Sequence, residues 1–101
     1  MSITIALKGS QLNTVDFVVD ERNILYSMFP SEDDRSYRCL GFVDAYGHTM
    51  FNYLQMDSFL SELDRVTEPA PSDEATFLLE RVREFAQRCA KERLYLWFHG
   101  D

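Results

Sequence analysis

The fold class is decided by residues 72–99, SDEATFLLERVREFAQRCAKERLYLWFH, where a helical pattern is followed at once by an alternating one. Ser72 is suited to cap a helix, and the two acidic residues after it favour the positive end of the helix dipole. At 100° per residue, the apolar side chains that follow share one sector: Ala75, Leu78, Leu79, Val82, Phe85, Ala86 and Cys89. Residues 94–99 alternate in the manner of a strand. The sequence therefore predicts a helix that leads directly into a strand.

A second amphipathic helix is expected to begin at Asp57, which is suited to be its N-cap. Pro69 and Pro71 end it, because two prolines in three positions cannot continue a helix. Its apolar side chains form one stripe, made of Met56, Phe59, Leu60, Leu63 and Val66. Its polar side chains are expected to face away from that stripe: Ser58, Ser61, Glu62 and Arg65.

Four more strands are expected before these helices. Alternation predicts strands over residues 3–8 and 15–20. The aromatic and β-branched run at 37–43 predicts a third strand, and a glycine-containing turn leads from it into a returning strand over 49–53. The period is ambiguous over residues 21–29, which fit either a short helix or an extended segment.

Because strands and helices are segregated along the chain, the expected class is α+β. The expected architecture is one largely antiparallel sheet of about five strands with two helices on one face. A chain of 101 residues and 11.8 kDa fits a single domain over residues 1–101. The longest apolar runs are about five residues, far below the ~20 that a membrane span needs, so no membrane partner is expected.

The two cysteines, Cys39 and Cys89, are expected to be small buried hydrophobes with reduced thiols. A disulfide-stapled secreted domain of this size usually carries four or more cysteines at closer spacings, although a single mutual disulfide remains an alternative. The first apolar stretch has no basic segment ahead of it, so no signal peptide is expected. Together these features predict a cytoplasmic protein.

The chain carries 17 acidic and 10 basic side chains, a net charge of −7. Residues 1–68 contain eleven acidic and five basic side chains, so the net negative charge lies mostly in the first two thirds of the chain. This balance argues against DNA or RNA as a direct partner, because phosphate binding needs clustered cations. The acids serve solubility, or they form a surface complementary to a basic protein. The candidate partner-binding carboxylates are Glu32, Asp33, Asp34, Asp16, Asp20, Glu21 and Asp44.

Tyr95 and Trp97 form a second candidate surface on the last expected strand. If both helices cover one face of the sheet, these two side chains point to the other face. They must then lie under another element, such as residues 21–29, or stay accessible. An accessible Trp/Tyr pair is typical of an interface hot spot, whereas a core that wraps round the pair would be purely structural.

No motif indicates catalysis, a cofactor or a metal ion. The histidines, His48 and His99, and the two cysteines include no close pair with the spacing of zinc ligands. The glycines are isolated, and the chain has neither a phosphate-binding loop nor a nucleophile elbow. We therefore assign no catalytic, cofactor-binding or metal-binding residue, and a small enzyme of unknown reaction is the third-ranked interpretation.

In size, charge and class this short acidic α+β chain resembles the immunity proteins of bacterial contact-dependent growth inhibition and polymorphic-toxin systems. Two of its phrases, DAYGHTMFN at 44–52 and YLWFHGD at 95–101, are similar to those of uncharacterised bacterial domains. Immunity proteins bind and neutralise a cognate toxin domain, often a basic nuclease. The resemblance thus implies a non-enzymatic antitoxin that occludes its target. The alternative function is a homodimeric structural or regulatory domain that uses the face of Tyr95 and Trp97 as its own interface.

Overall fold

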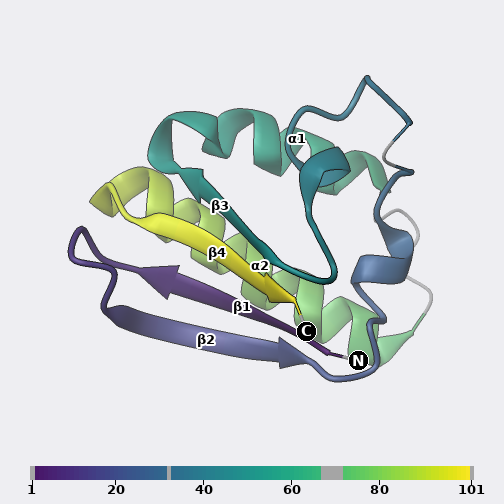
Figure 1. Ribbon diagram of the computed structural model, residues 1–101, viewed down its shortest axis with the longest axis horizontal. Coiled ribbons are helices and arrows are strands. Elements are labelled where there is room, and N and C mark those ends of the chain that lie inside the picture. Colours follow the sequence, from purple (N-terminus) through teal and green to yellow (C-terminus); the bar gives the residue numbers. More distant parts are fainter. Residues whose placement is uncertain (1, 32, 67–71, 101) are drawn as a thin grey trace.

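One antiparallel sheet of four strands forms the framework of the described residues, 2–31, 33–66 and 72–100, in the computed structural model (Figure 1). In chain order the strands are β1 (Ile3–Lys8), β2 (Thr14–Asp20), β3 (His48–Asn52) and β4 (Tyr95–Gly100). Their order across the sheet is β2-β1-β4-β3, so the first and last strands of the chain lie at its centre. The predicted α+β class is confirmed.

Both helices, α1 (Met56–Val66) and α2 (Asp73–Glu92), lie behind the sheet in Figure 1. α2 begins where the Ser72 hydroxyl accepts a hydrogen bond from the backbone N–H of Ala75, and it ends at Arg93 in the left-handed conformation. The core lies between helices and sheet, and its largest fully buried side chains include Phe59, Phe85 and Phe98. Neither helix combines the length and apolar character that a membrane crossing would need.

The prediction of a strand over residues 37–43 is wrong. This segment is irregular, with one 3-10 turn at Leu40–Phe42, and β3 pairs with β4 instead. The cause is Glu62 of α1, which is buried rather than facing away as expected. Its carboxylate accepts three backbone hydrogen bonds of 2.9–3.0 Å, from the N–H groups of Arg38, Cys39 and Leu40. These donors are therefore unavailable to a strand ladder, and the sheet has four strands rather than about five.

A second buried carboxylate, Asp20, organises the segment whose sequence pattern was ambiguous. Asp20 is only 1% exposed, at the end of β2. It accepts hydrogen bonds of 2.8, 2.9 and 3.2 Å from the backbone N–H groups of Ile24, Leu25 and Tyr26. A 3-10 turn, Tyr26–Met28, follows. Asp20 and Glu62 thus hold two points of the long connection between β2 and β3, residues 24–26 and 38–40.

The thiols of Cys39 and Cys89 are free and buried, as expected. Burial raises the pKa of each to about 11. Both side chains therefore behave as small core residues, and neither has the lowered pKa of a reactive cysteine.

Candidate protein-binding site

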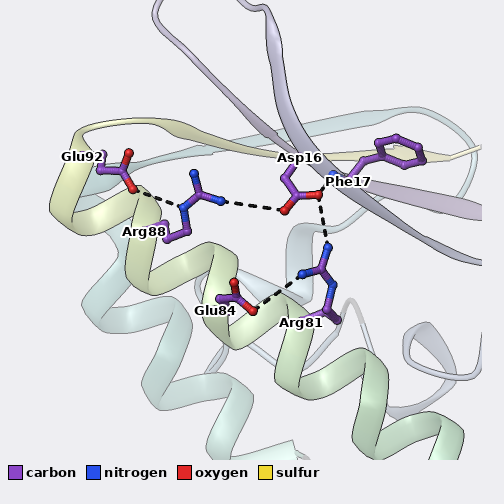
Figure 2. A network of polar contacts seen from close by, with 6 residues as sticks. All are labelled: Asp16, Phe17, Arg81, Glu84, Arg88 and Glu92. Carbon is purple, nitrogen blue, oxygen red and sulfur yellow. Dashed lines mark hydrogen bonds and ion pairs between the residues drawn. The ribbon is translucent and has the colours of Figure 1, made fainter.

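Asp16 points from β2 toward α2, where two guanidinium groups neutralise it (Figure 2). Its carboxylate lies 3.2 Å from Arg81 and 3.8 Å from Arg88. Each of these arginines also contacts an acid of its own helix, Glu84 at 3.6 Å and Glu92 at 3.2 Å respectively. The charge of Asp16 is thus balanced inside the molecule, so the structure places this candidate in a network that joins sheet and helix.

Asp20 likewise serves the fold rather than the surface, because both of its oxygens accept backbone hydrogen bonds and it is buried. Glu32 lies outside the described residues. Glu21, Asp33, Asp34 and Asp44 are exposed, so the acidic surface expected from the sequence is retained in part.

The exposed acids differ in how firmly they are held. Asp34 accepts hydrogen bonds of 2.7 and 3.0 Å from the hydroxyl and the N–H of Ser36, and the hydroxyl contributes most to lowering the pKa of this carboxyl. Asp44 accepts a 2.9 Å hydrogen bond from the N–H of Tyr46, and its own N–H donates to the Thr49 hydroxyl at 2.9 Å. The turn that leads into β3 therefore holds Asp44 in a fixed position.

Asp33 and Asp44, eleven positions apart, line one cleft of about 560 Å³, which we call the acidic cleft. Among the described residues that line it, two are acidic and none is basic. Two aromatic rings stand at the cleft with most of their surface exposed, Phe42 at 69% and Tyr46 at 75%. The acidic cleft thus combines free negative charge with large aromatic surface, as a protein-binding hot spot does.

Phe42 also borders a second hollow, of about 300 Å³, on which the charge is different. This hollow is lined by Asp34 together with two exposed cations, Arg35 and Arg38. The uncompensated negative charge around Phe42 therefore lies on the side of the acidic cleft.

The other sequence candidates, Tyr95 and Trp97, lie on the sheet face turned away from the helices, which we call the open face. Both are half-buried. The Lys8 ammonium lies 4.7 Å from the centroid of the Trp97 ring, and the His99 ring stacks on it at 5.0 Å. Residues 21–29 do not cover this pair, since Leu25 is buried in the core and the Phe29 ring contacts Phe98 on the helix side. Figure 1 shows no helix or strand in front of β1 and β4.

Sequence reasoning missed the two aromatic members of the acidic cleft. Phe42 was placed inside an expected strand, where an aromatic residue is ordinary. Tyr46 lies in the turn DAYGH, and a large aromatic side chain at a turn was the available signal of exposure.

No family model, curated protein or solved structure matches this chain. Within the described ranges, no group of three or more His, Cys, Asp or Glu side chains is placed to hold a metal ion. The features of this chain that bear on its function are therefore the acidic cleft and the open face.

Proposed function

We propose that this chain is a non-catalytic, immunity-type protein that neutralises a basic toxin domain by seating one of its cationic side chains in the acidic cleft. The observation that carries this proposal is the presence of Asp33 and Asp44 in the lining of one cleft, beside two exposed aromatic rings. An entering guanidinium or ammonium group would gain charge-assisted hydrogen bonds from the carboxylates and cation–π contact with the rings.

The carboxylates of the cleft are available to a partner. Neither Asp33 nor Asp44 makes an ion pair with another described residue, whereas Asp16 is paired twice. The turn around Asp44 is also held in advance, because the Asp44 carboxylate accepts a hydrogen bond from the Tyr46 N–H and the Asp44 N–H donates to the Thr49 hydroxyl. A surface already ordered loses less entropy on binding, which favours affinity.

The chemistry of the expected target explains how such binding would inhibit it. A nuclease needs cations to hold its polyanionic substrate, and carboxylates that occupy those cations compete with the substrate. The net charge of −7 would also steer the two proteins together at long range. The proposal therefore needs no catalytic group in this chain.

The test uses as binding partner a basic protein domain that co-purifies with this chain from its native host, and failure to recover any such partner counts against the proposal. The cleft variant carries Asp33→Asn and Asp44→Asn, and the control variant carries Asp57→Asn and Glu80→Gln on the exposed sides of α1 and α2. Both variants change the net charge by the same amount. They should therefore slow association to a similar extent, which separates long-range steering from direct contact.

The cleft variant alone should also dissociate faster, with a dissociation constant about a hundredfold higher, because the partner's cation loses both of its counter-charges. The wild-type chain should protect cells that express the toxin domain. The proposal is overturned if co-expression gives no protection, or if the cleft and control variants bind equally tightly.

A further inference from the structure

The open face carries an apolar row that runs across all four strands. The register places Ala6 between Phe17 and Trp97, and it places Met50 on the far side of Trp97. The two outer members are largely exposed, Phe17 at 58% and Met50 at 47%. Figure 2 shows Phe17 directed away from α2, while the adjacent Asp16 points toward it. The row thus presents unburied apolar surface on both edge strands.

We infer that the open face is the interface with a second copy of this chain, which covers the row with the same face. This inference does not rest on the proposed function, because it uses a surface other than the acidic cleft.

The charges of the open face favour a second copy over a basic partner. Within the described strands, the open face holds one lysine, Lys8, and two histidines, His48 and His99, but no carboxylate. A basic partner would find Lys8 there and no anion. Two copies of a chain with 17 acids would repel each other on most other surfaces, whereas here no described carboxylate opposes another.

Trp97, the central ring of the row, also has an unmet hydrogen-bonding requirement. Its indole N–H is buried and has no hydrogen-bond partner in the described part of the chain. A buried donor without an acceptor is unfavourable, and most such groups in folded proteins are satisfied. Because this N–H is already shielded from solvent in the single chain, covering the row with a second copy breaks no hydrogen bond to water there.

The strand order makes the row self-complementary. When two sheets pack face to face about a two-fold axis parallel to the strands, the strand order of one copy is reversed over the other. β2 then lies over β3 of the second copy, so Phe17 covers Met50 of that copy, twice per dimer. The same operation places Lys8 over the Tyr95 ring of the second copy, since the two residues share a row. Like charges therefore do not meet.

Sedimentation of the full chain at micromolar concentrations tests this inference, with Phe17→Ser as the probing variant and Phe77→Ser as its matched control. Phe77 is exposed to nearly the same extent, 56%, but lies on α2 behind the sheet. The wild-type chain and the Phe77 variant should both sediment as dimers. Phe17→Ser should weaken the dimer about a hundredfold, because each dimer loses two buried phenyl rings.

Met50→Lys on the opposite edge strand should weaken the dimer as well, which guards against a folding defect peculiar to one site. Trp97 is the only tryptophan of the chain, so its emission should shift to the blue as wild-type protein is concentrated. A wild-type chain that stays monomeric throughout overturns the inference. Equal weakening by the Phe77 and Phe17 variants overturns it too.

Discussion

Replacing Glu62 by Gln should destabilise the protein far more than a change of one atom type suggests. One Glu62 oxygen accepts from the N–H groups of Cys39 and Leu40, and the other accepts from that of Arg38. An amide that keeps its oxygen at the first position sets an NH2 group against the Arg38 N–H. One partly buried donor, the Arg38 N–H, then loses its acceptor and faces another donor, which costs roughly 1–3 kcal/mol.

The two hydrogen bonds that remain, from the N–H groups of Cys39 and Leu40, then have a neutral amide oxygen as acceptor instead of a carboxylate, which costs about 1 kcal/mol more. The sum is about 3 kcal/mol, a large share of the roughly 5–15 kcal/mol that stabilises a domain. Urea unfolding followed by far-UV circular dichroism measures the loss. The irregular segment over residues 37–43 should loosen first, which amide hydrogen exchange at 38–40 would report.

Glu80→Gln is the control, since it removes the same charge from an exposed position on α2. It should change stability by less than about 0.5 kcal/mol. If the Glu62 and Glu80 variants unfold at the same urea concentration with the same slope, the role given to the buried carboxylate is refuted.

Three further results are expected. Cys39 and Cys89, buried and with pKa values raised to about 11, should resist a thiol reagent at neutral pH until the chain unfolds; rapid labelling of the native protein would contradict this. His99 has a lowered pKa, chiefly through burial and then through Lys8 and His48, so the unfolded chain binds a proton that the folded chain does not. Stability should therefore fall as the pH drops below 6.5 and level off below the lowered pKa, and His99→Asn should flatten this dependence in denaturant titrations. Asp16→Asn should lower the free energy of unfolding by under about 1 kcal/mol in the same titrations, because the ion pairs that it removes are partly exposed to solvent. A larger loss would show that this network contributes more to stability than exposed ion pairs do.

Local patterns were sufficient for the existence of both helices and of the strands at both ends of the chain, although α1 begins at Met56 and has Asp57 in its first turn rather than at its N-cap. Their apolar periods are strong, and the Ser72 cap and the prolines at 69 and 71 mark the boundaries between them. The segment over residues 37–43 failed for a long-range reason. Its side chains favour a strand, but its backbone donors bind a carboxylate more than twenty positions away. The signal was a glutamate three residues after Phe59 and next to Leu63, within the buried part of α1.

The candidate site was predicted only in part for the same reason. Composition identified Asp33 and Asp44 as acidic candidates, but it could not separate them from Asp16 and Asp20. Those two carboxylates are used by arginines of α2 and by backbone N–H groups, and these partners are set by the fold. The exposure of Tyr46 and Phe42 likewise follows from the path of an irregular segment, which no sequence period specifies.

We propose that the acidic cleft receives a cationic side chain of a basic toxin domain. Hydrogen–deuterium exchange of the chain alone and in complex with the basic domain that co-purifies with it tests this proposal most directly. The proposal predicts that amides of residues 42–47 exchange about tenfold or more slowly in the complex, while the exposed side of α2 is unchanged. Protection of α2, with residues 42–47 unaffected, would contradict it.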